Sequence, residues 1–342
     1  MKEAALYTQL PDNRVRCELC AHRCRIADGR LGACRVRKNV GGTLYSLVYG
    51  RLTSQHIDPI EKKPLFHFYP GSRAYSIATP GCNFRCRWCQ NWQIAQIPHE
   101  AQIIAGAECT PEEVVEAARA AGCQSIAYTY TEPTVFFEFT YDAARYAHQI
   151  GLYNIYVTNG FMTREMLALL QPYLDAANVD LKAFRESTYR RFVGAHLQPV
   201  LDSLIAMKKL GIWLEVTTLL IPEINDEPDE LRDIARFIVH ELGADIPWHV
   251  SRFYPAYRMA DRRATPPETL KLAQQIGIEA GLKFVYIGNY PEAGYEDTRC
   301  PACQRVLIHR RGFFVAFNEV TENRCPNCGT VIAGRGLSWN VG

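Results

Sequence analysis

The chain has 342 residues, of which 48% are hydrophobic and 22% are charged, and its formal net charge is +2. This composition excludes a disordered chain, and the small net charge argues against nucleic-acid binding as a primary function. No apolar run reaches about 18 residues, so we expect no membrane span, and the N-terminus lacks the apolar region of a secretory signal. These features predict a cytoplasmic protein with more than one folding unit.

The chain contains an unusually large number of cysteines, thirteen, and eleven of them fall into three groups. In a chain without a secretory signal, closely spaced cysteines indicate metal or redox chemistry more often than disulfides. The first group lies within residues 1–70, which we expect to form a cysteine-rich N-terminal extension, and comprises Cys17, Cys20, Cys24 and Cys34. These thiols could bind zinc or an auxiliary [4Fe–4S] cluster, or could remain unliganded.

Residues 71–292 alternate between short apolar segments and helix-like segments. The apolar segments predict strands at residues 74–79, 125–131, 154–159, 178–182, 213–221, 248–254 and 283–287. Thr110 and Thr163 are typical helix N-caps, and Gly122 is a typical helix stop. The alternation predicts parallel strands, so we expect an α/β fold with a partial (β/α)6-type TIM barrel. In such folds the chemistry lies at the carboxyl ends of the strands.

The loop after the first predicted strand contains Cys82, Cys86 and Cys89, with Trp88 directly before the last cysteine. Three thiolates on one short loop can hold three irons of a [4Fe–4S] cluster and leave the fourth iron without a protein ligand. An open metal position is where a substrate or cofactor binds. A zinc knuckle that borrows a fourth ligand is the alternative interpretation.

Residues 293–342 are expected to form a zinc-ribbon-like module. They contain two Cys-x2-Cys pairs, made of Cys300, Cys303, Cys325 and Cys328. Two such pairs around a short hairpin are typical of a closed tetrahedral zinc site, although a rubredoxin-like single iron uses similar ligands. A tail of this size has too little core to fold unaided, so we expect bound metal to stabilise it.

The Cys-x3-Cys-x2-Cys loop resembles the signature of the radical S-adenosylmethionine (radical SAM) superfamily. Residues 71–288 are similar to activating enzymes of glycyl-radical proteins, such as the pyruvate formate-lyase activating enzyme. Residues 44–50 and 58–71 resemble the radical SAM enzyme of the AmmeMemoRadiSam system, and this resemblance covers nearly the whole chain. It implies a [4Fe–4S] cluster that binds S-adenosylmethionine at its open iron and cleaves it reductively to a 5′-deoxyadenosyl radical.

The resemblance also implies which strand ends hold the cofactor. Glu132 occupies the position of the glutamate in a Gly-Gly-Glu-Pro-like turn that holds the methionyl amino group, although the two glycines are absent here. Asn159 ends the third strand, near where the ribose and carboxylate would lie. Gly288 could approach the adenine, since glycine permits close backbone contact. The predicted cofactor-binding residues are Glu132, Asn159, Asp180 and Gly288.

Lys182 and His249 are the candidate catalytic residues. Asp180 and Lys182 lie two positions apart at the end of the fourth strand, so alternation places both on the face that points toward the mouth of the barrel. A structural ion pair at the rim is the alternative interpretation. His249 lies on the sixth strand, where a histidine is a buried structural residue about as often as a site residue.

We expect an oxygen-sensitive radical SAM enzyme that abstracts hydrogen from a substrate, which the sequence does not identify. The alternatives are an activase of a glycyl-radical enzyme and a non-catalytic zinc-binding scaffold. The resemblance implies a reduced flavodoxin- or ferredoxin-type electron donor. It also makes Memo-like and AMMECR-like proteins candidate partners.

Overall fold

Seven parallel strands follow one another in chain order across the central sheet of the computed structural model, which describes residues 1–339. An eighth strand runs antiparallel along one edge. In spatial order the strands are β8 (Ser54–Pro59), β9 (Arg73–Ala78), β11 (Ser125–Tyr128), β12 (Tyr153–Thr158), β13 (Ala176–Asp180), β14 (Trp213–Leu220), β15 (Trp248–Arg252) and β16 (Val285–Gly288). The seven strands predicted from the sequence are all present, and each lies within two or three residues of its expected bounds.

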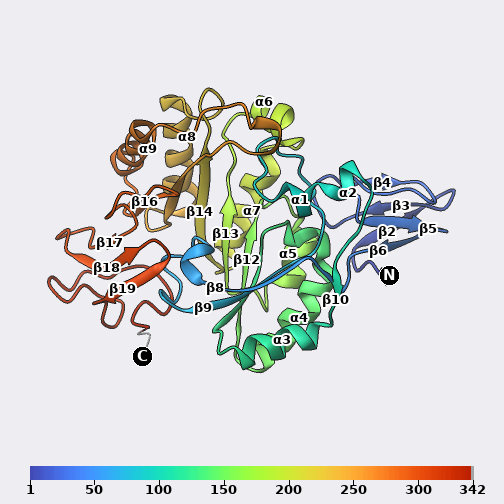
Figure 1. The fold of residues 1–342 in the computed structure, drawn as a ribbon, viewed down its shortest axis with the longest axis horizontal. Coiled ribbons are helices and arrows are strands. Elements are labelled where there is room, and N and C mark those ends of the chain that lie inside the picture. Colours follow the sequence, from blue (N-terminus) through green and yellow to red (C-terminus); the bar gives the residue numbers. More distant parts are fainter. Residues whose placement is uncertain (340–342) are drawn as a thin grey trace.

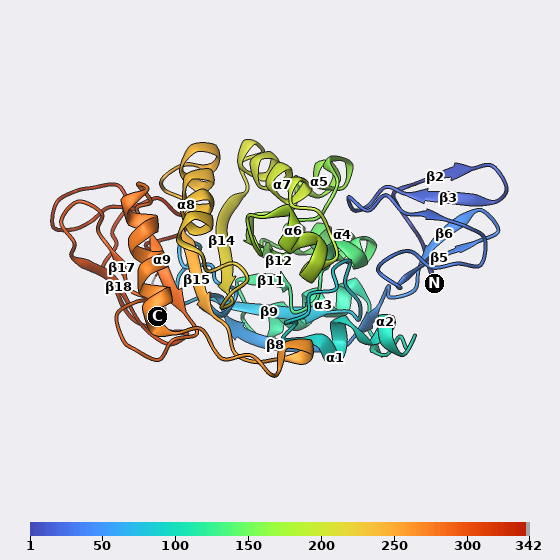
Figure 2. The same ribbon diagram turned by 90° about the horizontal axis from the view of Figure 1, so that it is seen from above.

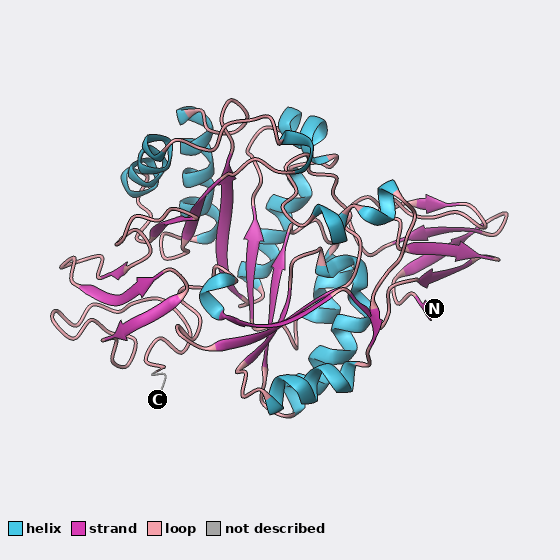
Figure 3. Ribbon diagram, viewed as in Figure 1, coloured by secondary structure: helices cyan, strands magenta, loops and turns pink. Residues whose placement is uncertain are grey.

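Helices connect the parallel strands, and Figure 3 shows them bordering the sheet. The longer ones are α3 (Pro111–Ala120), α4 (Phe137–Gln149), α5 (Arg164–Leu170), α7 (Gln198–Lys209), α8 (Pro228–Phe237) and α9 (Pro267–Glu279). Shorter helical segments are η1 (Ile60–Lys62), α1 (Trp92–Ala95), α2 (Ile97–Glu100), η2 (Pro133–Phe136), α6 (Glu186–Thr188), η3 (Tyr189–Val193), η4 (Ile238–Leu242) and η5 (Tyr257–Met259). This arrangement confirms the α/β class.

The predicted start of α3 shows how local sequence sets these elements. The Thr110 hydroxyl accepts a hydrogen bond from the Glu113 backbone N–H, and the Glu113 carboxylate accepts one from the Thr110 N–H. This reciprocal pair satisfies two N–H groups that would otherwise have no partner at the helix end. Gly122 then follows the helix with a φ of 63°, which glycine adopts without the steric cost of a Cβ atom.

The edges of the central sheet are β8 and β16, which do not pair with each other in the described chain. The strands therefore form an open sheet, and its description as a partial (β/α)6 barrel remains a prediction. Because β8 belongs to this sheet, the predicted boundary at residue 70 does not coincide with the edge of the sheet.

The N-terminal residues form two small antiparallel sheets that the sequence did not predict. One contains β1 (Lys2–Glu3), β6 (Thr43–Ser46) and β5 (Arg37–Val40), and the other contains β2 (Tyr7–Leu10), β3 (Arg14–Cys17) and β4 (Arg25–Ile26). A separate short pair joins β7 (Arg51–Leu52) to β10 (Ala107–Glu108). Figures 1 and 2 place these N-terminal sheets at one end of the molecule.

The C-terminal module lies at the opposite end (Figures 1 and 2) and contains the expected hairpin. Its strands are β17 (Thr298–Arg299), β18 (Val306–Arg311) and β19 (Phe314–Asn318). Its core includes Phe66, Phe284 and Tyr286, so it is continuous with one end of the central sheet. The last three residues of the predicted module, 340–342, lie outside the described residues. Within residues 1–339, no helix combines the length and the apolar character needed to cross a membrane.

Candidate active site at the carboxyl ends of the strands

The cysteine loop follows β9, as the sequence predicts, and two backbone hydrogen bonds hold its shape. Gly81 N donates to Ile94 O at 2.9 Å, and Arg85 N donates to Val193 O at 2.8 Å. Gly81 has a φ of 104°, and a Cβ atom there would lie 2.6 Å from Val36 Cγ1. The loop can therefore pack against the N-terminal residues only because glycine occupies this position.

All three loop cysteines border one cavity of about 520 Å³ at the carboxyl ends of the strands. This volume is in the range of cavities that bind ligands of nucleotide size. The cavity brings together residues from nearly every strand end and from η1, namely Lys62, Lys63, Cys82, Cys86, Trp88, Cys89, Tyr130, Glu132, Asn159, Asp180, Lys182, Thr217 and Ser251. Of the residues predicted from the sequence, Glu132, Asn159, Asp180 and Lys182 are among them.

Glu132 is almost fully buried at the cavity wall. Its carboxylate accepts hydrogen bonds from Thr134 N at 3.0 Å, from Thr158 Oγ1 at 2.7 Å and from Asn159 N at 2.8 Å. Burial raises the pKa of Glu132, although these hydrogen bonds favour the charged form. The carboxylate thus ties the turn after β11 to the end of β12.

Asn159 connects this wall to the cysteine loop. Its Nδ2 atom donates to Asn83 Oδ1 at 2.7 Å and lies 3.8 Å from Cys82 Sγ. Phe161 N donates to Asn159 Oδ1 at 2.9 Å, which fixes the orientation of the amide. The sulfur atom of the first cysteine thus contacts the Asn159 amide, and it also accepts a hydrogen bond from Phe84 N at 3.3 Å.

Asp180 and Lys182 form an ion pair of 2.6 Å between Oδ2 and Nζ at the end of β13. Burial disfavours the charged ammonium, but the Asp180 carboxylate raises the pKa of Lys182 above its ordinary value. Lys182 therefore holds a positive charge beside the cysteine loop. Asp180 and Lys182 thus form an ion pair and also line the cavity, so this geometry agrees both with a structural ion pair and with a role in the site.

The sequence did not single out Lys62, Lys63 and Tyr130 as site residues. Lys63 Nζ lies 2.6 Å from Asp58 Oδ2 and 4.4 Å from the centre of the Tyr130 ring, and the Tyr130 hydroxyl donates to Asp58. Burial lowers the pKa of Lys63 to about 8, against the effect of the Asp58 carboxylate. The sequence shows two adjacent lysines, Lys62 and Lys63, in the segment 58–71. They reach the cavity because β8, which precedes them, pairs with β9.

The family model of the radical SAM superfamily matches residues 76–238, which include the cysteine loop and the strand ends around it. The chain belongs to the radical SAM superfamily. A protein of Methanocaldococcus jannaschii described as uncharacterized is 47% identical over 334 residues, which cover 97% of this chain and 99% of that relative. A putative glycyl-radical enzyme activating enzyme of the same organism is 25% identical over 52% of this chain and 66% of its own length.

Among solved structures, the radical SAM protein fold is matched at low sequence identity. Streptococcus suis SuiB bound to S-adenosylmethionine has a TM-score of 0.51 and 11% identity, covering 69% of this chain and 56% of SuiB. A radical SAM methyltransferase from Sphaerobacter thermophilus has a TM-score of 0.50 and 16% identity, covering 64% and 67% of the two chains. These similarities concern the fold alone.

Membership in the radical SAM superfamily implies a [4Fe–4S] cluster and S-adenosylmethionine, and the cysteine loop fits such a cluster. Trp88 Nε1 is buried at the cavity wall and has no hydrogen-bond partner within the described part of the chain. A buried N–H group ordinarily has an acceptor, and a cluster sulfur between the three cysteines would provide one. Burial raises the pKa of Cys86 to about 12, so cluster binding has to displace its proton.

His249 is not among the residues that line the radical SAM cavity, so the catalytic role expected for it stays a prediction. Its side chain is buried near the amino end of β15, and Nε2 lies 2.6 Å from Glu215 Oε2. The Glu215 carboxylate also accepts hydrogen bonds from Phe66 N at 2.9 Å and from His67 N at 2.7 Å. His249 thus forms a buried pair with Glu215 and lies beside Thr217 of the neighbouring strand, which does line the cavity.

Gly288 ends β16 but does not line the cavity. A Cβ atom at this position would lie 3.7 Å from Ser251 Oγ, and Ser251 does line it. The predicted approach of Gly288 to the adenine thus has no direct support in the cavity wall.

The four C-terminal cysteines lie close enough together to bind one metal ion. Their sulfur atoms all lie within 4.8 Å of one another, and these residues are Cys300, Cys303, Cys325 and Cys328. The Cys303 thiol accepts a backbone hydrogen bond from Arg305, which lowers its pKa to about 6 and favours a thiolate. This geometry agrees with the four-cysteine metal site of the predicted ribbon, and it does not distinguish zinc from iron.

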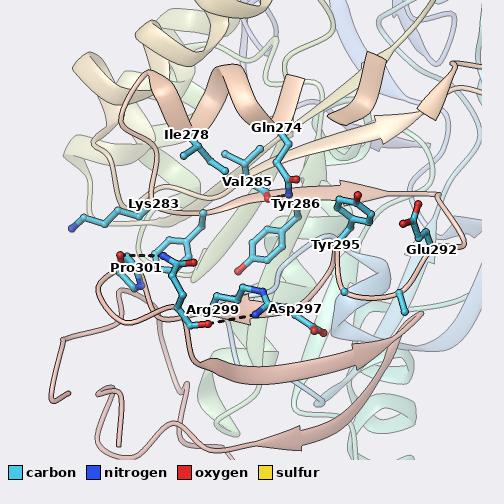
Figure 4. Close-up of a pocket in the computed structure, with 14 residues that line it drawn as sticks. Gln274, Ile278, Lys283, Val285, Tyr286, Glu292, Tyr295, Asp297, Arg299 and Pro301 are labelled. Atoms are coloured by element: carbon cyan, nitrogen blue, oxygen red, sulfur yellow. Dashed lines mark hydrogen bonds between the residues drawn. The ribbon is translucent and has the colours of Figure 1, made fainter. Parts of the chain in front are cut away.

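A second cavity, of about 410 Å³, lies between α9, β16 and the C-terminal module (Figure 4). Tyr286, Tyr295 and Arg299 contribute to its wall. It contains none of the predicted site residues, so we assign it no part in the radical SAM site.

Proposed function

We propose that this protein is an enzyme that binds S-adenosylmethionine in the 520 Å³ cavity and uses it to abstract hydrogen from a substrate. When bound and reduced, the [4Fe–4S] cluster supplies the electron that cleaves S-adenosylmethionine to methionine and a 5′-deoxyadenosyl radical. Cys82, Cys86 and Cys89 hold that cluster. The observation that carries the proposal is that all three cysteines and the polar ends of β11, β12 and β13 border one cavity.

Each polar residue has a separate role in this proposal. Glu132 and Asn159 orient the methionyl end of the nucleotide, since both lie beside Cys82 on the cavity wall. Lys182 offsets the negative charge of the cysteine loop, and Asp180 fixes the position of the Lys182 ammonium. The apolar part of the wall, including Phe84 and Leu219, limits access of water to the reacting atoms.

Replacement of one cluster ligand tests the proposal. We expect Cys86→Ala to leave the fold intact and to abolish 5′-deoxyadenosine formation from S-adenosylmethionine and dithionite, measured anaerobically by liquid chromatography. The matched control is Cys109→Ala, because Cys109 is partly buried and lies outside all three cysteine groups. An undiminished yield of 5′-deoxyadenosine from Cys86→Ala would refute the assignment.

Activation of a glycyl-radical enzyme is a second candidate function. Two relatives support it, the putative activating enzyme described above and the isethionate sulfite-lyase activating enzyme of Nitratidesulfovibrio vulgaris, which is 27% identical over 48% of this chain and 57% of its own length. Incubation with pyruvate formate-lyase, S-adenosylmethionine and dithionite tests it by electron paramagnetic resonance. A glycyl radical signal supports the activase, and 5′-deoxyadenosine formation without that signal favours another hydrogen donor.

The C-terminal cysteines are proposed to bind zinc. Two sulfur–sulfur distances there are 3.5 Å and 3.7 Å. A tetrahedral zinc ion with bonds of about 2.3 Å places its sulfurs about 3.8 Å apart, so little rearrangement is needed. A non-catalytic zinc scaffold would contain about two zinc ions and no sulfide per chain, and metal analysis of anaerobically purified protein separates it from the enzyme.

The proposed reaction needs a low-potential electron donor, and we propose a flavodoxin or ferredoxin. Memo-like and AMMECR-like proteins are proposed partners on the basis of the sequence resemblance. All thirteen cysteines are free, which agrees with the reducing environment of the cytoplasm proposed for this protein.

A further inference from the structure

The four N-terminal cysteines line a cavity separate from the one that Cys82, Cys86 and Cys89 border. We propose that Cys17, Cys20, Cys24 and Cys34 together hold a second [4Fe–4S] cluster, in which every iron has a protein ligand. This inference goes beyond the proposed reaction, and it holds whether or not the cavity binds S-adenosylmethionine.

The fold brings these four cysteines to one small cavity of about 20 Å³. Cys17 ends β3 and Cys24 precedes β4, and Cys17 N donates to Cys24 O at 3.0 Å, so the two small strands hold this half of the site. The remaining wall is apolar apart from one arginine, and the lining residues are Cys17, Leu19, Cys20, Cys24, Ile26, Gly32, Cys34, Arg37 and Val135. An apolar wall with four sulfur atoms is an environment that suits an inorganic cluster.

Arg37 supplies the observation that points to a bound anion. Its side chain is 2% exposed and forms an ion pair with Glu138 through Nη2. Its Nε and Nη1 atoms are buried and have no hydrogen-bond partner among residues 1–339. Unpaired guanidinium N–H groups are costly to bury, and four thiolates with a cluster between them carry the net negative charge and the sulfur acceptors that would satisfy them.

The spacing of the sulfur atoms favours a cluster over a single metal ion. The C-terminal group has all four sulfurs within 4.8 Å of one another, whereas within the described residues no three of the N-terminal sulfurs meet that limit. The N-terminal group also has no counterpart of the two short sulfur–sulfur contacts in the C-terminal group. A single ion draws all its thiolates together, whereas a four-iron cluster keeps each thiolate on a different iron.

The N-terminal site packs directly against the radical SAM loop. His22 Nε2 lies 2.8 Å from Asn83 O, and the His22 ring centre lies 4.8 Å from that of Phe161. Ala21 N donates to Phe161 O at 3.3 Å, and Cys20 forms an isolated bridge with Met162. A second cluster would therefore lie next to the first, with one hydrogen-bonded contact between the segments that carry them.

Metal analysis of a variant without the radical SAM cluster tests this proposal. In full-length protein with Cys82, Cys86 and Cys89 all changed to Ala, purified anaerobically, we expect about four iron and four sulfide per chain, against about eight of each in the unchanged protein. The dithionite-reduced variant should give a cluster signal in electron paramagnetic resonance that S-adenosylmethionine does not alter, because no iron is open.

Two further measurements make the outcome specific. Adding Cys20→Ser and Cys24→Ser to the triple variant should remove its remaining iron, while far-ultraviolet circular dichroism checks the fold. Two zinc ions without iron, two iron atoms per chain, or no metal in the triple variant would each overturn the proposal. If the triple variant does not fold, about four iron atoms rather than eight in the unchanged protein would overturn it.

Discussion

Tyr130 adopts a backbone conformation that ordinarily belongs to glycine. Its φ is 63°, in the turn where the related signature has glycines before the glutamate. The strain is held by the side chain, because the hydroxyl donates to Asp58 and the ring packs on the Lys63 ammonium. A residue without this anchor would not maintain the turn that presents Glu132.

We predict that Tyr130→Phe destabilises the protein by about 1 to 2 kcal/mol, because a hydrogen bond to a charged carboxylate is lost while the ring remains. Urea denaturation followed by circular dichroism measures this difference. Tyr45→Phe is the control, since the Tyr45 hydroxyl donates no hydrogen bond to any described residue. Equal denaturation midpoints for the two variants would show that the Asp58 contact contributes nothing.

The residues of the site differ in how well the sequence predicts them. Cys82, Cys86 and Cys89 lie on one loop, so their spacing alone brings them together. Lys63 comes from a segment before the first parallel strand, and only pairing of β8 with β9 places it at the cavity. Asp180 and Lys182 lie two positions apart, so alternation along β13 places both on one face, and both line the cavity.

At the scale of elements, the segment between β8 and β9 covers the part of the central sheet around Glu215 of β14, and this segment is called the floor below. Phe66 N and His67 N both donate to Glu215, and Arg310 Nη2 of the C-terminal module donates to Phe66 O at 2.8 Å. The Arg310 and Glu61 side chains have 0% exposure and lie 3.4 Å apart. This floor joins the central sheet to the C-terminal module through buried polar contacts.

His67 makes the stability of this floor dependent on pH. Its Nδ1 atom donates to Ala333 O at 2.6 Å, and its Nε2 atom lies 2.6 Å from the Tyr286 hydroxyl, from which a neutral ring can accept. Burial lowers the pKa of His67 to about 4. The unfolded chain takes up a proton below about pH 6.5 and the folded chain does not, so this contribution to stability is complete above pH 6.5 and is lost as pH falls toward 4.

We therefore predict that the free energy of unfolding falls by up to about 3 kcal/mol from His67 alone between pH 7 and pH 4. His67→Gln retains one donor and one acceptor but does not titrate, so its stability should depend less steeply on pH. His196→Gln is the control, because His196 is exposed. Parallel curves of unfolding free energy against pH for unchanged protein and His67→Gln would contradict this assignment.

The sequence predicted the strands that form longer apolar segments in regular alternation with helices. The seven parallel strands are buried apolar runs between helix signals, and each was found. The N-terminal strands have two to four residues each and mixed burial, as in Arg25–Ile26 and Arg37–Val40. Tertiary pairing rather than local pattern defines such short strands, so propensity could not reveal them.

At the scale of the whole molecule, we predict that loss of the C-terminal metal destabilises the central sheet as well. In Cys325→Ser, the module loses a buried ligand, and the Arg310 and Glu61 pair loses its support. We expect the unfolding temperature to fall by about 5 °C or more in calorimetry, within a single transition. Cys109→Ser is the control, and two separate transitions in the unchanged protein would show that the module unfolds independently.

The closed floor also determines how molecules enter and leave. The side opposite the cysteine loop is filled by Phe66, His67 and Arg310, which are all buried. In the proposed reaction, nucleotide and substrate would both enter from the side of the cysteine loop, and a macromolecular substrate bound there would cover the exit of the nucleotide. The spent nucleoside and methionine would then depart only after that macromolecule does, which makes the order of product release a property of the architecture.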